Sequence, residues 1–537
     1  MLDADPVLDR IRAYLVQHRE ALQAVGIQLA ITDRQRCLGV VTEGFADLEA
    51  RAPVEPDHLF QIGSISKGFT AILVMQAHEE GRLHLDAPVT EYLPWFEVRS
   101  RFAPITVHHL LSHTSGLVEG MEHTGEAVPE VHALRETQTG FPPGERMRYS
   151  NVGYKTLGLI VERLEGRPWW ELARGQVLEP LGMIRTEPIY THAIRRRLAT
   201  GYEPFYDDRP WQLRHGFAPA PWGESATADG TICSTAEELT AYLRLLLREG
   251  GGILDRSSFE RMTRPNLPDP DEPADTYGYG VKWVDRGGRR LLGHSGATLG
   301  YRALALCDPT AGLGVTMLCT GPAVRLPAVE FALDVLRAAA DGKDLPEVPE
   351  PEDPSRVSDT ASYAGDYEGP DGEFYRIVAE DDRLLLQVSD GRVELGPVER
   401  DVFTVQAEDL DRFALRFVWE EGEVTYLVHG SRWMRNAHYH GPERFEDPPA
   451  AGVVTGHYRS HNPWASNARV FARRGELWLQ WPFEREVEAH PLTELEDGSY
   501  RVGEPWSPDR ARFEDVIDGR AQRMVHDGAP LYRTFTP

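Results

Sequence analysis

Two acidic, proline-rich segments divide the 537-residue chain. The first, LPEVPEPEDP at 345–354, cannot continue a helix or a central strand, because proline has no backbone N–H and fixes its own φ angle. The second, FEDPPAAG at 445–452, is a shorter break of the same kind. Together they predict a large first domain at 1–345, a linker at 346–360, and two small domains at 361–447 and 453–537. A chain this long is expected to hold several domains of about 150 residues each.

The first part alternates strand and helix patterns. Four short apolar, β-rich runs predict strands: GIQLAITD (26–33), CLGVVTEG (37–44), RALALCD (302–308) and GVTMLCTG (314–321). Helical patterns lie between them at 66–81, 151–166 and 234–251. The first of these is apolar nearly all round from Phe69 to Ala77, and Ser234 with Glu237 forms a capping box at the start of the last. Strands near both ends with helices between them predict one sheet built from distant segments, in an α/β or α+β domain.

The two small parts consist of short alternating runs separated by turn residues, which is typical of an antiparallel barrel or sandwich. They also resemble each other: Gly365 and Tyr367 correspond to Gly456 and Tyr458, and RLLLQV (383–388) corresponds to ELWLQW (476–481). We therefore expect a duplicated β-barrel. Three tryptophans could line a ligand pocket there, but alternating spacing favours barrel core: Trp464, Trp478 and Trp481.

Bulk charge and apolar patterning exclude several classes. The net charge of −27 argues against binding nucleic acid, whose phosphates such a surface would repel. No apolar run approaches the length of a membrane span, and the start reads as an amphipathic helix on Leu8, Ile11 and Leu15 rather than as a signal peptide. The four cysteines are scattered, which predicts buried thiols in a reducing compartment and hence a cytoplasmic protein.

One lysine stands out because the chain has 57 lysines and arginines, of which only four are lysines. In QIGSISKGFT (61–70), Lys67 follows Ser64 by three residues, which places both on one face if Ser64 opens a helix. Burial lowers the pKa of a lysine, so Lys67 could remove the proton that keeps a serine hydroxyl a poor nucleophile. Alone, S-x-x-K is a weak motif, and Gly63 could be only a turn residue.

Two further clusters carry groups suited to the same chemistry. PPGERMRYSNVGY (142–154) places Tyr149 and Asn151 just before a predicted helix. A tyrosine beside a lysine can share acid and base work, and an asparagine can orient both a lysine and a substrate amide. LLGHSGATLGYR (291–302) supplies His294 next to a predicted strand, where the N–H of Ala297 could join that of Ser64 in an oxyanion hole.

The motifs S-x-x-K, Y-x-N and H-x-G, in this order and spacing, resemble those of the penicillin-recognising serine hydrolases. Within them, the chain resembles the branch of class C β-lactamases, D-aminopeptidases and β-lactamase-like esterases, which uses Tyr-x-Asn where class A enzymes use S-D-N. Three other stretches resemble the family: ITVHHLLSHTSGL (105–117), LEPLGM (178–183) and STAEEL (234–239). The resemblance covers residues 1–345. It implies an α+β fold, with an antiparallel sheet and an all-helical subdomain inserted between Ser64 and His294, followed by two lipocalin-like antiparallel β-barrels.

The resemblance also implies roles for the residues in these motifs. Ser64 would be the nucleophile and Lys67 its activating partner. Tyr149 would protonate the leaving group and then activate water, while Asn151 would hold the substrate. His294 would line the site and share a hydrogen-bond network with Tyr149.

The strand after His294 would complete the site. Ser295 and Gly296 would line the substrate, and the amides of Ser64 and Ala297 would hold the oxyanion. The expected course is one acyl-enzyme that is then hydrolysed, with no cofactor and no metal.

The third motif departs from the pattern of β-lactamases and DD-carboxypeptidases, which begin it with lysine. His294 is largely neutral at pH 7 unless perturbed, which weakens recognition of a substrate carboxylate. Histidine here resembles D-stereospecific aminopeptidases and some esterases, and two C-terminal barrels are similar to the aminopeptidases. We therefore expect a small amide or short peptide with a D-residue as substrate. A carboxylesterase comes second, and a weak β-lactamase or DD-peptidase third.

Three rival interpretations compete. GHSGA (293–297) resembles the nucleophile-elbow motif of an α/β-hydrolase, in which Ser295 would be the nucleophile. That motif needs glycine at position 297, where this chain has Ala297. His109 and His113, at i and i+4, could share a zinc ion on a helix, although buried or capping histidines are the favoured interpretation. A non-catalytic binding homologue would be signalled by loss of Ser64, Lys67 or Tyr149, and all three are present. Whether the barrels cap the site, restrict substrate size or mediate homo-oligomer assembly stays open.

Overall fold

A computed structural model describes residues 3–120, 125–268, 270, 274–389, 391–482 and 489–535. The chain forms two compact units. The first comprises residues 1–203 and 217–351, and the second comprises residues 204–216 and 352–537. The second unit is therefore discontinuous, a feature that the sequence analysis did not predict.

The first unit is built on an antiparallel sheet whose described strands number eight, in the order β3-β2-β1-β12-β11-β10-β9-β8. The central pairing joins the two ends of the unit, because Gly26 lies opposite Thr320 and Asp33 opposite Leu313. This confirms the expectation of one sheet assembled from distant segments. The strands are β1 (Gly26–Asp33), β2 (Cys37–Asp47), β3 (Ala52–Pro53), β8 (Thr276–Tyr277), β9 (Lys282–Arg286), β10 (Arg289–Thr298), β11 (Tyr301–Asp308) and β12 (Leu313–Thr320).

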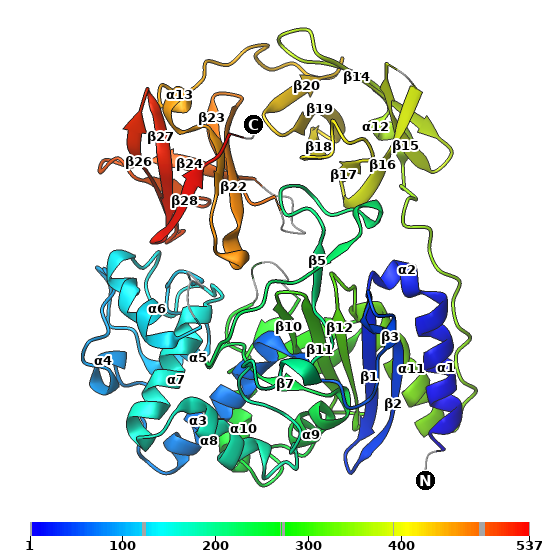
Figure 1. The fold of residues 1–537 in the computed structure, drawn as a ribbon, viewed down its shortest axis with the longest axis vertical. Coiled ribbons are helices and arrows are strands. Elements are labelled where there is room, and N and C mark those ends of the chain that lie inside the picture. The colour runs from blue at the N-terminus through cyan, green and yellow to red at the C-terminus, as the bar shows by residue number, and fades with distance from the viewer. Residues whose placement is uncertain are drawn as a thin grey trace. The chain divides into compact units, whose positions relative to one another are not determined.

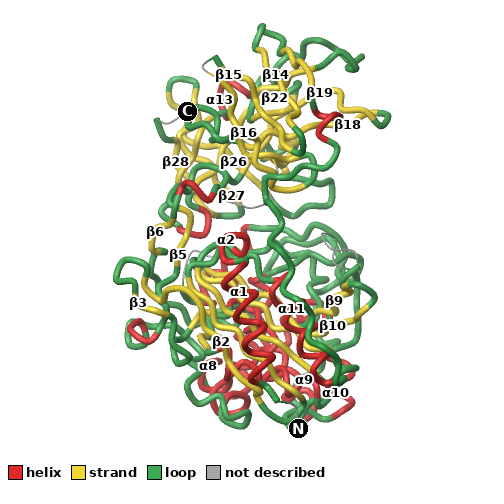
Figure 2. Tube along the Cα trace, turned by 90° about the vertical axis from the view of Figure 1, so that its right-hand side faces the viewer, coloured by secondary structure: helices red, strands yellow, loops and turns green. Residues whose placement is uncertain are grey.

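Helices cover both faces of this sheet (Figures 1 and 2). On one face, α1 (Asp5–Gln17) and α11 (Leu326–Ala340) pack on the apolar side chains of β1 that include Ile27 and Leu29. On the other, α3 (Ser66–Glu79) and α9 (Ala236–Leu247) share a core with Ala30. Alternate residues of β1 thus face two separate cores, which is why the strand is buried from Gly26 to Thr32.

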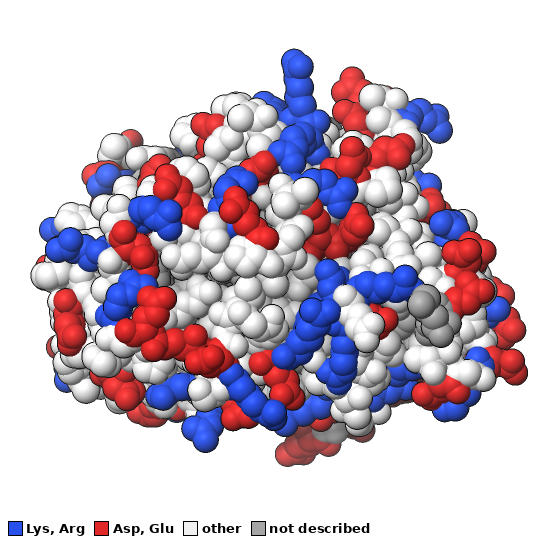
Figure 3. Space-filling model, turned by 90° about the horizontal axis from the view of Figure 1, so that it is seen from below, with Lys and Arg blue, Asp and Glu red and all other residues white. Residues whose placement is uncertain are grey.

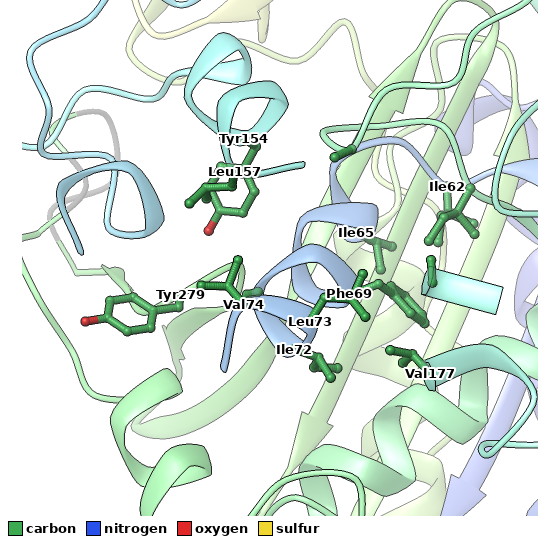
Figure 4. Packing of buried hydrophobic residues seen from close by; sticks show 14 of the residues in the cluster. Ile62, Ile65, Phe69, Ile72, Leu73, Val74, Tyr154, Leu157, Val177 and Tyr279 are labelled. Carbon is green, nitrogen blue, oxygen red and sulfur yellow. The ribbon is translucent and has the colours of Figure 1, made fainter. Parts of the chain in front are cut away.

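Helix α3 lies at the centre of the larger core. Its residues Phe69–Met75 are all buried, as the apolar sequence predicts. Figure 4 shows Phe69 and Leu73 of this helix among Tyr154, Leu157 and other apolar side chains. The helix that carries Lys67 is therefore held on every side.

Between Ser64 and His294, the described residues form helices that are joined by long loops, and short strands also occur there. The remaining helices of the first unit are α2 (Arg19–Leu22), α4 (Val89–Tyr92), α5 (Val107–Leu111), α6 (Ala127–Ala133), α7 (Asn151–Glu165), α8 (Trp169–Leu172) and α10 (Arg256–Met262). The short strands are β4 (Phe60–Gln61), β7 (Cys233–Ser234), β5 (Tyr202–Pro204) and β6 (Phe217–Pro219), which form the pairs β4-β7 and β5-β6.

The start of α9 differs by one residue from the predicted capping box. Thr235, not Ser234, is the N-cap, and its hydroxyl accepts a hydrogen bond from the Glu238 amide at 3.2 Å. The Ser234 hydroxyl instead shares a hydrogen bond with that of Thr186 at 2.8 Å. A tertiary contact therefore decides between two adjacent residues that are equally suited to cap.

The second unit contains two closed antiparallel barrels, each with eight strands in the part of the chain that the structure describes. The first barrel comprises β13 (Gly365–Glu368), β14 (Phe374–Glu380), β15 (Arg383–Val388), β16 (Gly391–Glu399), β17 (Val402–Val405), β18 (Ala414–Glu420), β19 (Glu423–His429) and β20 (Arg432–Arg435). The second comprises β21 (Gly456–Arg459), β22 (Asn467–Arg473), β23 (Glu476–Gln480), β24 (Ala489–Glu494), β25 (Tyr500–Val502), β26 (Arg510–Ile517), β27 (Arg520–His526) and β28 (Ala529–Arg533). A short helix precedes each, α12 (Thr360–Tyr363) and α13 (Ala451–Val454).

Equivalent tyrosines show that the two barrels repeat one design. Tyr367 and Tyr458 are both fully buried on the first strand of their barrel. The Tyr367 hydroxyl donates to the carbonyl of Tyr363 at 2.8 Å, and the Tyr458 hydroxyl donates to the carbonyl of Val454 at 2.7 Å. Each bond thus ties the first strand to the short helix four residues earlier.

The tryptophans of the second barrel do not gather at one place. Trp481 belongs to the apolar core, whereas Trp478 lies against the guanidinium of Arg473 at 4.6 Å from its ring centroid. The interpretation of these tryptophans as barrel core therefore holds for Trp481, whereas Trp464 is only half-buried.

Residues 204–216, which we call the anchor segment, contact both barrels of the second unit. Asp411 of the first barrel is 1% exposed and accepts hydrogen bonds from Arg209 at 2.8 Å and Arg214 at 2.6 Å, with His215 at 3.1 Å. On the second barrel, Asn467 donates to the backbone oxygen of Asp207 at 2.6 Å. The anchor segment is therefore an integral part of this unit.

The described helices include none that is both long and apolar enough to span a bilayer. The face drawn in Figure 3 carries acidic and basic side chains interspersed with each other. The net charge of −27 is thus not gathered there into one continuous acidic surface.

Candidate active site

Ser64 lies in a 3₁₀ turn, η1 (Gly63–Ile65), immediately before α3. Three residues per turn keep positions i and i+3 on one side, so Lys67 in the first turn of α3 faces back toward Ser64. Its Nζ lies 3.0 Å from Ser64 Oγ, and its side chain is fully buried. The structure therefore brings together the two residues of the first motif.

Two further oxygens hold the Lys67 amine. Asn151 Oδ1 lies 2.7 Å from Nζ, and the backbone oxygen of Asp229 lies 2.9 Å from it. Both atoms can only accept, so they take two N–H donors. A neutral amine has two N–H bonds and one lone pair, which leaves its lone pair for the Ser64 hydroxyl. The geometry thus suits a lysine that removes the serine proton.

Tyr149 lies beside this amine, and its side chain is half-buried. Lys67 Nζ is 4.8 Å from the centroid of its ring. Burial raises the pKa of Tyr149 well above the ordinary value of a phenol, and the carboxylates of Glu119 and Asp229 raise it further, while the Ser64 hydroxyl acts in the opposite direction. Tyr149 therefore keeps its proton at neutral pH and can act as an acid.

The start of α7 fixes Tyr149 and Asn151. Ser150 is the N-cap, and its hydroxyl accepts from the Gly153 amide at 3.2 Å and donates to the Val118 carbonyl at 2.8 Å. The Ser150 amide donates to Nδ1 of the fully buried His113 at 3.0 Å. Bonds on both sides of Ser150 thus orient the residues that flank it.

Strand β10 passes unusually close to η1. Gly63 has φ +53°, and a side chain there would place Cβ 2.7 Å from the amide nitrogen of Ala297. A Cβ on Gly296 would lie 1.9 Å from the Ile62 oxygen and 3.2 Å from the Ser64 nitrogen. Glycine at both positions permits this approach, which places the amides of Ser64 and Ala297 on adjacent segments. That arrangement is the one an oxyanion hole requires.

Ser295 lies within a β-hairpin and pairs with Leu304 of β11. A nucleophile elbow needs a sharp turn from a strand into a helix. The hairpin contradicts the interpretation of GHSGA (293–297) as such an elbow.

His294 is buried and neutral. Its Nδ1 contacts the Ser295 carbonyl, which can only accept, so Nδ1 carries the hydrogen and Nε2 accepts from the Tyr277 hydroxyl at 3.0 Å. Burial lowers the pKa of His294 to about 3, and Lys282 on the adjacent strand adds to this effect. The hydrogen-bond partner of Nε2 is thus Tyr277, whereas the ring of Tyr149 lies 6.5 Å away between centroids.

The two histidines of the zinc hypothesis do not share a helical face. His109 lies on α5 and its Nδ1 accepts from the Thr106 amide at 3.1 Å, as a capping residue. His113 lies beyond the end of α5, with φ +55°. Within the described ranges, no group of three or more histidine, cysteine, aspartate or glutamate side chains is arranged to hold a metal ion.

A family model described as Beta-lactamase matches residues 11–338, which is more than half of the chain. The chain belongs to the β-lactamase family. The family holds serine hydrolases, among them esterases and amidases. This confirms the resemblance and the fold class expected from the sequence.

Two curated relatives of this β-lactamase family member differ in their names. Penicillin-binding protein 4 of Amycolatopsis lactamdurans is 30% identical over 341 residues, which cover 59% of this chain and 87% of the relative. Esterase EstB of Burkholderia gladioli is 31% identical over 251 residues, covering 42% of this chain and 62% of the relative. The family therefore does not fix the substrate.

Two solved structures share the fold. The octameric penicillin-binding protein homologue from Pyrococcus abyssi has a TM-score of 0.58 at 24% identity and covers 79% of this chain and 99% of its own. The D-amino acid amidase from Ochrobactrum anthropi SV3, in complex with L-phenylalanine, has a TM-score of 0.51 at 26% identity and covers 62% of this chain and 99% of its own.

Three residues of this family member's site escaped the sequence analysis. Tyr277, in DTYGYG (275–280), binds His294, and Asp229, in a loop before β7, supplies a carbonyl to Lys67. Glu119 is exposed, and its carboxylate accepts from Asn151 Nδ2 at 3.2 Å. Only Tyr277 had a local signal, because Gly278 and Gly280 follow it closely; the other two are recognisable only once the chain is folded.

Proposed function

We propose that the protein is a serine amidase that acts, through an acyl-enzyme, on amides or short peptides with an N-terminal D-residue. The observation that carries the proposal is the placement of Lys67 Nζ, 3.0 Å from Ser64 Oγ and hydrogen-bonded to two oxygens that can only accept. This geometry supplies an activated nucleophile without a metal ion.

In acylation, Ser64 Oγ attacks the substrate carbonyl carbon while its proton passes to Lys67. The carbonyl oxygen becomes an oxyanion, which the amides of Ser64 and Ala297 stabilise. Collapse of the tetrahedral intermediate breaks the C–N bond. The departing amine takes a proton from Tyr149, which its raised pKa keeps in the acid form. Lys67 returns the serine proton to Tyr149.

In deacylation, water attacks the ester carbonyl and gives up a proton through Tyr149 and Lys67. The same two amides hold the second oxyanion. When the C–O bond breaks, Ser64 Oγ regains a proton and the carboxylic acid leaves. Asn151 keeps the Lys67 amine in place through both half-reactions.

The charges around the site support a substrate with a free amino group. His294 is neutral, so it offers no positive charge to a β-lactam carboxylate. Glu119 places a carboxylate at the exposed end of the Asn151 side chain, where it can accept hydrogen bonds from a substrate ammonium. The preference for a D-residue is supported by histidine in the third motif and by the likeness to a D-amino acid amidase.

A carboxylesterase is the second candidate, favoured by the 31% identity to Esterase EstB. An alkoxide is a better leaving group than an amine and needs less help from Tyr149. The same site could therefore hydrolyse esters without hydrolysing amides.

The deciding experiment compares D-alanine p-nitroanilide with p-nitrophenyl butyrate, with Ser64→Ala as control. Ser64-dependent release of p-nitroaniline is the expected result and supports the amidase. Turnover of the ester alone would overturn the amidase in favour of the esterase. Activity that survives unchanged in Ser64→Ala would refute the acyl-enzyme itself.

Glu119→Gln tests the ammonium contact. A charged hydrogen bond contributes about 1.5–3 kcal/mol, so KM for the anilide should rise at least about tenfold. The butyrate ester has no ammonium, and its KM should stay within about twofold. Glu91→Gln, at an exposed position of α4, is the matched control. Equal effects on both substrates would exclude this role for Glu119.

Two further features are proposals of the same kind. The four cysteines are free, which supports a cytoplasmic location.

A homo-oligomer is suggested by the octameric homologue with the same fold. The molar mass measured by light scattering tests this oligomeric state.

A further inference from the structure

The site contains a buried lysine that the proposed mechanism does not use. Lys155 lies on α7, four residues after Asn151 and therefore one turn further along the same face. It is 3% exposed, and its Nζ lies 2.8 Å from Glu130 Oε2 of α6 and 3.9 Å from Asp229 Oδ2. Burying such an ion pair is costly, and apolar residues would often stabilise a fold as well. The pair therefore points to a role other than stability.

Asp229 joins this cluster to the nucleophile. Its carboxylate faces Lys155, while its backbone oxygen accepts from Lys67 at 2.9 Å. The preceding carbonyl, that of Ala228, accepts from the Thr70 hydroxyl at 2.6 Å. The Asp229 carbonyl is thus held by α3 through its neighbour and by α7 through its own side chain. We call Glu130, Lys155 and Asp229 the buried triad.

The charges of the buried triad complement the charge that forms on Lys67. Two carboxylates and one ammonium leave one negative charge. Lys67 becomes positive when it accepts the Ser64 proton, so the four groups then sum to zero. In a buried site of low dielectric constant, this balance favours the proton transfer.

We propose that the buried triad positions the Asp229 carbonyl on Lys67 and balances the charge that Lys67 gains from Ser64. The proposal rests on the acyl-enzyme function proposed above and extends it to residues that touch neither substrate nor nucleophile. They are positioning residues, and their signature is the pH dependence of Ser64 reactivity.

The other titratable groups near Lys67 do not obscure the pH dependence of Ser64 reactivity, because they do not change charge near neutral pH. Burial raises the pKa values of Tyr149 and Tyr154 well above the ordinary value for tyrosine. Burial lowers the pKa of His113 well below its ordinary value and that of His294 to about 3. Both tyrosines therefore stay protonated and both histidines stay neutral at neutral pH. The charged groups of the surroundings, Glu119 and Lys282, are unchanged in every variant below.

The test measures the rate at which a fluorophosphonate labels Ser64, and kcat/KM for D-alanine p-nitroanilide, both against pH. In each pH profile, the acid limb is the rise in rate as Lys67 loses its proton. Asp229→Asn keeps the backbone carbonyl but removes a negative charge, which lowers the pKa of Lys67, so this limb should move to lower pH by about one unit. Lys155→Met removes a positive charge, so the limb should move to higher pH by a similar amount. Shifts of the acid limb in opposite directions would show that charge balance is responsible, because a general loss of structure would affect both variants in the same way.

A double variant gives the matched control. Lys155→Met/Glu130→Gln removes one charge of each sign and leaves the net charge of the triad unchanged. Its acid limb should return to near the wild-type position, with KM within about twofold of the wild type. Tm and circular dichroism establish that each variant is folded.

The outcomes distinguish this proposal from the function on which it rests. Folded Asp229→Asn and Lys155→Met variants whose limbs stay fixed, or move in the same direction, overturn the charge balance. A wild type that is labelled at Ser64 but does not cleave the anilide would refute the proposed substrate, while the labelling profiles still decide the role of the triad. No labelling of Ser64 at any pH overturns both.

Discussion

At the scale of single residues, the proton affinity of Lys67 governs the chemistry. The amine donates to Asn151 and to the Asp229 carbonyl, and it faces Ser64 Oγ. A guanidinium could keep the positive charge in this place, but it cannot give up a proton. A single substitution of Lys67 by arginine can therefore separate the role of its positive charge from its role in proton transfer.

Lys67→Arg should lower kcat by about 10²–10⁴-fold, which is the usual contribution of a general base. The exposed Lys343, paired with Asp341, provides a matched control, because Lys343→Arg should leave kcat unchanged. The measurement is the steady-state rate on whichever p-nitro substrate the wild type turns over. Full activity in Lys67→Arg would contradict a role in proton transfer.

Residues in short motifs could be found from the sequence, because their neighbours along the chain are also their neighbours in space. Ser64 and Lys67 are one helical turn apart, and Tyr149 and Asn151 flank one cap. Asp229 acts through its backbone oxygen, so its side chain gives no signal of that contact. Tyr277 meets His294 only because β8 and β10 both pair with β9. Such contacts depend on sheet register, which the sequence left undetermined.

At the scale of elements, the approach of β10 to η1 is the most demanding feature. The strand brings Gly296 against the Ile62 oxygen, where no Cβ fits. Any side chain here must push β10 away from the turn that carries Ser64. The Ala297 amide would move with the strand.

Gly296→Ala should therefore lower kcat/KM by about 10²-fold or more, since one oxyanion donor contributes about 10²–10³. Gly175→Ala is the matched control, because a Cβ at this exposed position meets nothing within 4 Å. Kinetics on the same substrate, with Tm as a measure of folding, checks both variants. An active Gly296→Ala enzyme would show that Ala297 is not an oxyanion donor.

Elements with a strong periodic pattern were the easiest to predict. The apolar run of α3 and the helix α7, whose C-cap is Gly166 with φ +66°, follow from local sequence alone. The cap of α9 could not be assigned in the same way, because Thr186 engages the hydroxyl of Ser234. Local chemistry thus gave the elements, and tertiary contacts set their boundaries.

At the scale of the whole molecule, Asp411 is central to the second unit. It is 1% exposed and is bound by Arg209, Arg214 and His215 of the anchor segment. Removing one partner of a buried ion pair leaves the others without compensation, and the effect on stability is large. The anchor segment should therefore loosen when this carboxylate is lost.

Asp411→Asn should weaken the attachment of the anchor segment by about 3 kcal/mol. Hydrogen exchange of the amides at 204–216 should then accelerate by about a hundredfold. Asp409→Asn, at a nearby exposed position, should leave the exchange unchanged. Unaltered protection in Asp411→Asn would mean that other contacts hold the segment.

The anchor segment also imposes an order on biosynthesis. Its residues leave the ribosome well before residues 352–537, with which they form one compact unit. Domains usually fold in turn as they are synthesised, at about 5–20 residues per second. Here Arg209 and Arg214 must wait for Asp411, so the second unit closes only after the first barrel has been translated. A chain that terminates after residue 351 would carry a permanently incomplete segment, and the barrels are therefore not a removable C-terminal addition.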